Sequence, residues 1–173
     1  IWDRGYFQAM NVWSTYPNGS DGRAVFGNYF EGNDPCPNAT MDVRSIPRSR
    51  KLIGTASSYF EQAYGALIVI DPAIPDDPSM AKLKRMTPDQ PFPWREMSRY
   101  TGPLDYGTPW PLAELFCLCV YDSDSAIRRG PENNYGIYLV DAFGNRELIY
   151  RDPEIASLSP MPFRARTTGS SRS

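Results

Sequence analysis

The feature that most constrains the fold is a strand–turn–strand pattern that recurs along the chain. Its clearest copy is GIYLVDAFGN followed by RELIY (136–150), and related stretches are NVWSTYPNGSDGRAVFGN (11–28) and ALIVIDPAIPDDPSMAKLKRMT (66–87). Each copy combines a β-branched and aromatic run, a cluster of turn residues and a return run led by a basic residue. Asn-Gly, Asp-Gly and Gly-Asn accept the positive φ of tight turns, so each copy predicts a β-hairpin.

A second kind of hairpin alternates with the first. It begins with a proline-containing strand in DVRSIPRSRKLIGTASS (42–58) and in PWPLAELFCLCVYDS (109–123), and IASLSPMPF (155–163) has the form of a truncated beginning. One hairpin of each kind gives a four-stranded antiparallel unit, and such a unit of about 40–50 residues recurring in tandem is typical of a propeller blade.

We therefore predict an all-β fold, a β-propeller fragment of four-stranded antiparallel blades with about two full blades and partial ones. The predicted parts of a partial propeller over 1–166 are a half blade (about 6–28), a blade (42–87), a Pro-rich loop (88–108), a blade (109–151), the start of the next blade (155–165) and then a flexible tail (167–173). A β-sandwich would need about seven strands without tandem similarity. A closed propeller needs at least about four blades, so other segments are expected to complete the fold.

Composition excludes several partners and reactions. The formal net charge of −2 and the pI near 5.2 give no global attraction to nucleic acid. The basic run of Arg44, Arg48, Arg50 and Lys51 is predicted to be a polar hairpin turn rather than a phosphate site. No run approaches the roughly 18 apolar residues of a membrane helix, so no membrane insertion is expected. The chain has no histidine, which removes the commonest general base and the usual catalytic triads.

Metal sites have weak support. Cys117 and Cys119 are two residues apart in a strand pattern, so they are predicted to face one side as core residues and to be poorly placed to bond to each other. Asp122 and Asp124 alternate at a strand end, where two carboxylates could hold Ca²⁺ with loop carbonyls. A polar strand terminus is the simpler interpretation.

The run RDPE (151–154) is the first candidate site. In a structural role, Asp152 bonds backbone amides at the crossover between blades and Arg151 pairs with a neighbouring carboxylate. In a functional role, Arg151 and Glu154 line a binding site at the end face of the propeller.

Aromatic residues form the second candidate site. Trp94, Tyr100, Tyr106 and Trp110 cluster in and after the Pro-rich loop. They are expected to cover the edge of a blade, and the alternative is a stacking surface for a sugar or peptide.

The stretch NYGIYLVDAFGNRELIYRDPEIASLSPMPFRAR (134–166) resembles the C-terminal portion of the hydrazine synthase alpha-subunit middle-domain family. The stretches at 6–28 and 42–58 and YGALIVIDP (64–72) are also similar to it, and the strand–turn–strand hairpins resemble TolB-type propeller repeats. The resemblance implies a propeller and a periplasmic or secreted location. It does not extend to the family's c-type haem, because the chain lacks histidine and any Cys-x-x-Cys spacing.

The leading functional prediction is a non-catalytic interaction or scaffold module of a larger exported bacterial protein. It needs no cofactor in this chain, and its partners would be the remainder of the parent protein or neighbouring subunits. One alternative is the propeller portion of a haem-containing oxidoreductase whose haem ligands lie outside this chain. Another alternative is carbohydrate or peptide binding at the aromatic loop.

Overall fold

The structure is a computed structural model, and it describes residues 12–27, 37–57, 64–77, 79–93, 106–122 and 134–163. These residues form antiparallel β-strands and no helix, which confirms the all-β expectation for this part of the chain. The strands are β1 (Val12–Ser14), β2 (Arg23–Phe26), β3 (Ala39–Ser45), β4 (Leu52–Ser57), β5 (Tyr64–Ile70), β6 (Leu83–Arg85), β7 (Tyr106–Ala113), β8 (Phe116–Asp122), β9 (Tyr135–Asp141) and β10 (Arg146–Tyr150).

The tight turns form where the sequence has turn residues. Between β9 and β10, Gly144 has a φ of 93°, and Asp141 accepts hydrogen bonds from the amides of Phe143 and Asn145. Between β1 and β2, Gly19 has a φ of 81° and donates its amide hydrogen to the Tyr16 carbonyl oxygen at 2.8 Å. Glycine adopts these angles without steric cost, so the local sequence determines where both hairpins turn.

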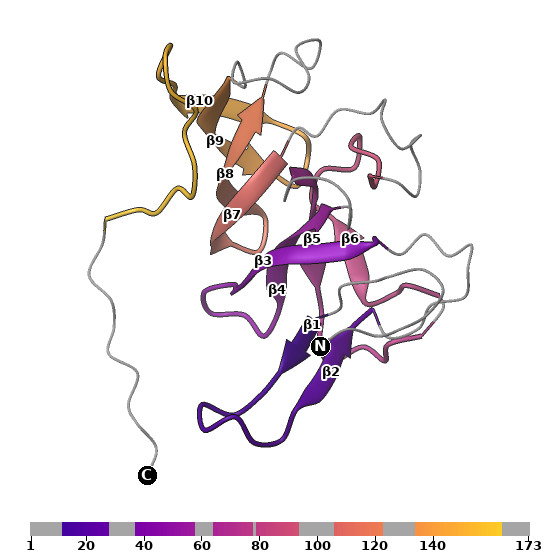
Figure 1. Cartoon of the computed structure of the whole chain (residues 1–173). Coiled ribbons are helices and arrows are strands. Elements are labelled where there is room, and N and C mark those ends of the chain that lie inside the picture. Colours follow the sequence, from indigo (N-terminus) through magenta and orange to yellow (C-terminus); the bar gives the residue numbers. More distant parts are fainter. Residues whose placement is uncertain are drawn as a thin grey trace.

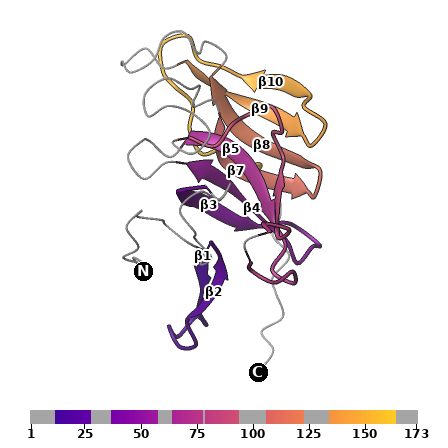
Figure 2. The same ribbon diagram turned by 90° about the vertical axis from the view of Figure 1, so that its right-hand side faces the viewer.

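Strands β3–β6 pair in sequence order as one antiparallel meander, and strands β7–β10 form a second. Strand β5 joins the two: its C-terminal residues Ile68–Ile70 pair with β6, whereas Tyr64 and Gly65 at its start pair with β7. The eight strands therefore form one sheet, in which β3 and β10 are the outer strands of the main path. Figure 1 shows the β1–β2 hairpin, the first meander and the second meander one above another, and Figure 2 shows the same succession from the side.

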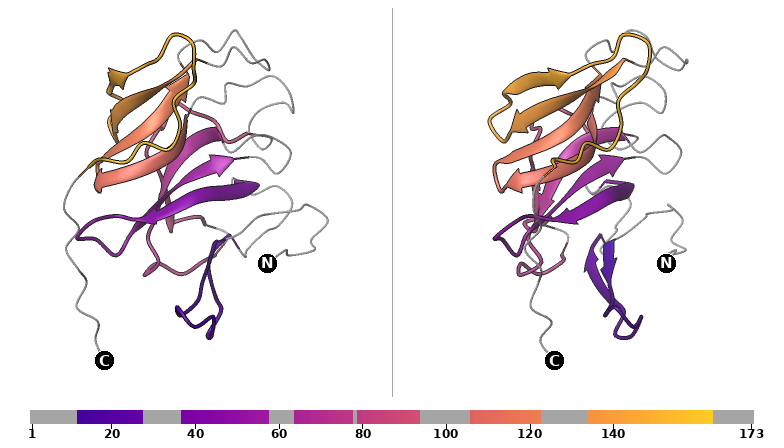
Figure 3. Two further views of the ribbon diagram at one scale, coloured as in Figure 1. Left: turned by 60° about the vertical axis from the view of Figure 1, so that its left-hand side comes forward. Right: turned by 90° about the vertical axis from the view of Figure 1, so that its left-hand side faces the viewer.

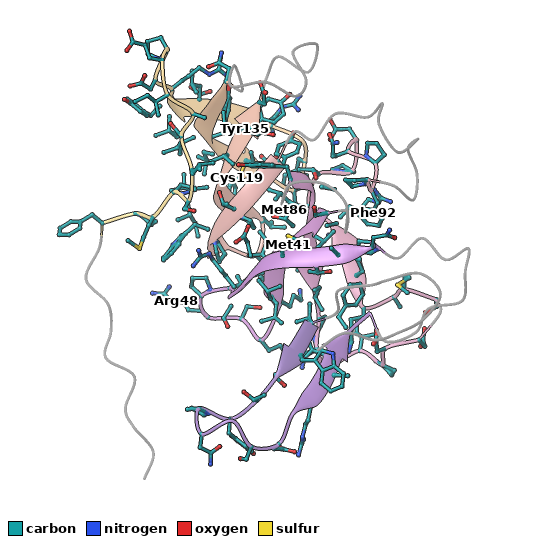
Figure 4. All side chains as sticks on the ribbon, viewed as in Figure 1. Met41, Arg48, Met86, Phe92, Cys119 and Tyr135 are labelled. Atoms are coloured by element: carbon teal, nitrogen blue, oxygen red, sulfur yellow. The ribbon has the colours of Figure 1, made fainter. Side chains whose placement is uncertain are left out.

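Two hydrophobic cores hold the three parts together. One lies between the meanders and contains Ile53 and Leu67 from the first with Cys119 and Val140 from the second. In Figure 4, the labelled Cys119 and Met86 lie where the two meanders meet. The other core lies on the opposite face of the first meander, where Phe26 of the hairpin packs with its Ile68. Both faces of the first meander are thus covered by other β-strands of the chain.

Polar contacts reinforce these junctions. Glu114, in the turn between β7 and β8, accepts hydrogen bonds from Lys51 Nζ at 2.6 Å and from Ser49 Oγ at 2.5 Å, both in the turn between β3 and β4. At the junction between the first meander and the β1–β2 hairpin, Lys82 Nζ donates a hydrogen bond to the carbonyl oxygen of Val25 in β2 at 2.6 Å. The basic run at 44–51 is divided: Arg48 lies in the β3–β4 turn with a φ of 59°, whereas Arg44 belongs to β3.

The structure differs from the predicted ranges in two places. Strand β7 begins at Tyr106, inside the range 88–108 predicted as a loop, because Tyr106 and Gly107 pair with the start of β5. The range 155–165, predicted to start a further blade, is described up to Phe163 and forms no strand there. Instead, residues 151–163 form a C-terminal segment that turns back from β10 past β9 toward β7, as Figure 3 shows in yellow.

The C-terminal segment is attached by backbone hydrogen bonds. Ser157 donates its amide hydrogen to the Tyr135 carbonyl oxygen in β9 at 2.8 Å, and Ser159 donates to Thr108 Oγ1 in β7 at 3.2 Å. Pro160 is buried. Polar backbone contacts therefore hold the segment, while several of its apolar side chains point away from the sheet and stay exposed.

Candidate functional site

Asp152 of the predicted RDPE site forms a turn. Its Oδ1 accepts hydrogen bonds from the amides of Glu154 at 2.8 Å and Ile155 at 3.1 Å, and its Oδ2 accepts one from Tyr150 Oη at 3.3 Å. These bonds stabilise the charged carboxylate, the amide of Glu154 most, and lower the pKa of Asp152 below its usual value. Asp152 thus organises the exit from β10.

Arg151 is partly buried, whereas Glu154 is exposed. Its Nη2 donates a hydrogen bond to Tyr138 Oη at 2.6 Å, and its Cζ lies 5.8 Å from the centre of the Tyr138 ring. Gly136 makes room for this side chain, because a Cβ atom there would lie 3.2 Å from Arg151 Nε. The structure therefore places Arg151 against the second meander.

Arg151 belongs to a group of residues that we call the arginine–tyrosine cluster: Tyr106, Tyr121, Tyr138, Arg146 and Arg151. The tyrosines come from three successive strands, with ring centres 4.7 Å apart for Tyr106–Tyr121 and 5.2 Å apart for Tyr121–Tyr138. Arg146, at the start of β10, donates from Nη1 to Tyr106 Oη at 2.6 Å and to Tyr121 Oη at 3.3 Å. Contacts between aromatic rings and guanidinium groups at these distances are attractive.

The cluster also reaches the first meander. Asp89, in the turn after β6, places Oδ2 at 3.9 Å from Arg146 Nη1. The Asp89 side chain is 61% exposed and that of Arg146 is 35% exposed, so this end of the cluster is open to solvent. Tyr106, in contrast, is buried. Burial is the largest influence on the pKa of its hydroxyl and raises that pKa well above the usual value. The Tyr106 hydroxyl therefore stays protonated at any physiological pH.

The predicted aromatic site is only partly within the described residues. Trp94 and Tyr100 lie outside them. Tyr106 is 2% exposed and offers no free ring face. Trp110 lies beneath Arg44 of the first meander, with Arg44 Cζ 4.7 Å from the ring centre. Tyr106 therefore contributes to the arginine–tyrosine cluster, and Trp110 contributes to the packing between the meanders through Arg44.

Only one of the two predicted metal residues lies within the described residues. Asp122 is 7% exposed at the end of β8, and Asp124 lies outside the described residues. Within the described ranges, no group of three or more His, Cys, Asp or Glu side chains is placed to hold a metal ion.

Cys117 and Cys119 have free thiols and share the core between the meanders, which confirms that they face one side as core residues. Burial is the main cause of a raised pKa for the Cys119 thiol. Cys36 lies outside the described residues.

Four residues of this site are not among those predicted from the sequence: Arg146, Tyr121, Tyr138 and Asp89. Tyr121 and Tyr138 alternate with apolar residues in their strands, and Arg146 leads the return strand of its hairpin. These signals are visible in the sequence, but only the pairing of β7, β8, β9 and β10 brings the side chains together.

A second feature is an apolar surface at the end of the second meander. Strand β10 has all five residues exposed, including Leu148 (46%), Ile149 (57%) and Tyr150 (54%). The C-terminal segment adds exposed apolar side chains, which are Ile155, Leu158, Met161 and Phe163. We call the two sets together the β10 surface. Among the described strands, β10 pairs only with β9.

Comparisons with protein-family models, with characterised proteins and with solved structures found no match to this chain. The resemblance to the hydrazine synthase alpha-subunit family therefore stays a prediction. In the part of the chain that the structure describes, no helix is long and apolar enough to cross a bilayer.

Proposed function

We propose that this chain is a non-catalytic interaction or scaffold module, a portion of a β-propeller within a larger exported bacterial protein. The β10 surface is where the module would receive the next four-stranded β-unit of that protein. The single observation that carries the proposal is that β10 exposes Leu148, Ile149 and Tyr150 on a strand with one described neighbour. An exposed apolar edge of this kind is a template for pairing and packing with further strands.

The packing within the chain favours a further β-unit as the partner. The β1–β2 hairpin covers one face of the first meander and the second meander covers the other, so successive β-units bury each other's apolar faces. The second meander follows the first in the chain and has one such partner within the described residues. A further unit of the same kind would bury the β10 surface in the same way.

One feature departs from separate propeller blades. Blades pack through their faces, whereas Tyr64 and Gly65 of β5 also pair with Gly107 and Tyr106 of β7. The proposal therefore requires the two meanders to remain joined at this short ladder while they pack face to face. The periplasmic or secreted location is proposed on the resemblance alone.

Urea unfolding of the isolated chain tests the proposal, followed by the fluorescence of its four tryptophans and by sedimentation at several protein concentrations. A module that lacks its partner unit is expected to unfold over a broad range of urea or to self-associate through the β10 surface. A single sharp transition of a monomer, unchanged by concentration, would show that the chain completes its own core and would contradict the proposal.

A further inference from the structure

At the exposed end of the arginine–tyrosine cluster, contacts with two tyrosines fix the orientation of Arg146. Its Nη1 donates to phenol oxygens on two other strands, Tyr106 Oη on β7 and Tyr121 Oη on β8. The guanidinium Cζ lies 4.9 Å from the centre of the Tyr121 ring. A long, flexible side chain that starts on β10 is thereby held in one position, which lowers the entropic cost of binding a ligand.

The opposite edge of the guanidinium is unused. Hydrogen bonds and the contact with Asp89 all involve Nη1, and within the described ranges Nε and Nη2 of Arg146 make no hydrogen bond. Nε and Nη2 together form the planar fork that binds two oxygens of one anion. The side chain is 35% exposed, so a ligand from solvent can approach it.

Charge selects the class of anion. Asp89 Oδ2 lies 3.9 Å from Arg146 Nη1, too far for a hydrogen bond, and its side chain is 61% exposed. The site therefore combines one positive charge with one loosely associated negative charge, which suits a monoanion better than a dianionic phosphate. The phenol oxygens of Tyr106 and Tyr121 accept hydrogen bonds from Nη1, which leaves the edge formed by Nε and Nη2 of Arg146 for the ligand.

We propose that Arg146, oriented by Tyr106 and Tyr121, binds the carboxylate of a ligand through Nε and Nη2, while Asp89 remains near Nη1. The carboxylate belongs either to a small organic acid or to an acidic side chain of a peptide. The site uses Arg146 at the start of β10 and none of the exposed apolar side chains of the β10 surface, so it does not rest on the proposed scaffold role.

The test is a titration of the whole chain with sodium acetate at constant ionic strength, following the Arg146 Nε–Hε resonance by NMR. We expect a saturable shift with acetate and none with sodium chloride. The blocked tripeptide Ac-Ala-Glu-Ala-amide is titrated in parallel, and tighter binding of the peptide than of acetate identifies a peptide carboxylate as the ligand. Equal or weaker peptide binding identifies a small organic acid.

Charge variants make the test specific. Asp89→Asn removes the neighbouring negative charge and is expected to tighten acetate binding by up to about fivefold, the factor for one unit charge at about 4 Å in water. Glu147→Gln is the matched control, since it removes the same charge from the neighbouring exposed position and is expected to leave the affinity unchanged. Arg146→Lys keeps the charge, loses the fork and is expected to abolish saturable binding, measured then by the tyrosine ring resonances.

Three results would overturn the proposal: identical shifts with acetate and chloride, equal tightening by Glu147→Gln and Asp89→Asn, or tighter binding of inorganic phosphate than of acetate. If Arg146→Lys does not fold, the comparison of Asp89→Asn with Glu147→Gln decides, because both acids are exposed and neither substitution disturbs the packing of the cluster.

Discussion

Thr108 and Ser159 both have left-handed backbone conformations and are joined to each other: the Ser159 amide donates to Thr108 Oγ1 at 3.2 Å, and their φ angles are 44° and 48°. Positive φ is costly for residues other than glycine, and most so for a β-branched one in a strand. The bond lies where the pairing of β7 with β8 shifts register, between Gly107 and Trp110. The C-terminal segment is thus anchored at an irregular point of β7.

This anchor leads to the first prediction. Thr108→Val keeps the β-branched shape and the backbone cost but removes the acceptor, so we expect a loss of about 0.5–1 kcal/mol in the free energy of unfolding. Hydrogen exchange at Ser159 is expected to become faster. Thr108→Ser retains the hydroxyl and is expected to keep the exchange rate, and equal effects of both substitutions would show that the bond does not hold the segment.

Gly65 lies where β5 passes from the first meander to the second. A Cβ atom there would lie 2.1 Å from the Ala56 carbonyl oxygen and 2.9 Å from Pro93 Cγ. Because backbone cannot move aside as a flexible side chain can, Gly65→Ala is expected to cost at least about 3 kcal/mol, the upper end for overpacking. Gly22→Ala is the control, since its nearest neighbour would be at 3.9 Å. Urea unfolding gives the free energy of unfolding of both variants. A Gly65→Ala variant as stable as the wild type would mean that Gly65 does not lie close to Ala56 and Pro93.

Cys117 and Cys119 are both 0% exposed, and burial raises the pKa of Cys119. Thiols react as thiolates, so both are expected to resist a thiol reagent at pH 8 in the native state and to react together as urea unfolds the chain. The experiment uses Cys36→Ser, which removes the third thiol. Rapid labelling of two thiols without urea would place them outside the core.

Asp141 stabilises the turn between β9 and β10. The Asn145 side chain is the main cause of the lowered pKa of Asp141, and the amides of Phe143 and Asn145 add to it. A carboxyl whose pKa is lower in the folded than in the unfolded state contributes stability above the unfolded pKa of about 3.9, and this contribution is lost as pH falls through the folded pKa. Asp141→Ala is therefore expected to destabilise the chain at pH 7 and to have progressively less effect below about pH 4. Urea unfolding at several pH values checks this, and a constant difference between variant and wild type would exclude titration of Asp141 as the cause.

Ile149→Lys tests the β10 surface. A lysine on an exposed edge strand opposes further pairing, so we expect weaker self-association of the isolated chain in sedimentation experiments. Its free energy of unfolding is expected to change by less than about 0.5 kcal/mol, because the side chain is already 57% exposed. Tyr16→Lys in the β1–β2 turn is the matched control, at 59% exposure. Equal reduction by both variants would indicate a general effect of charge rather than contact through β10.

Much of the secondary structure can be predicted from single stretches of sequence. The runs at 12–26 and 135–150 contain alternating strand formers around a turn with glycine, and both are hairpins in the structure. Cys117 and Cys119 share a face because side chains in a strand alternate with a period of two. The start of β7 was missed because its pairing partners, Tyr64 and Gly65, lie far away in the chain.

The candidate site was far less predictable. Their motifs predict a role for Arg151 and Tyr106, and the structure places both in one cluster with Arg146, which no motif marks as a site residue. Nothing in the spacing of Tyr106 and Arg146 indicates that Nη1 lies 2.6 Å from Oη. That contact depends on strand order and on the register of three ladders.

The hairpins, their turns and the all-β class follow from local sequence, because turn residues and alternating strands act through neighbours in the chain. Three features depend on tertiary contacts: β5 pairs with both β6 and β7, the meanders share a core, and Arg146 and Asp89 approach each other. The physical reason is that these contacts join residues distant in the chain, where sheet order, register and curvature set the geometry and no local preference does.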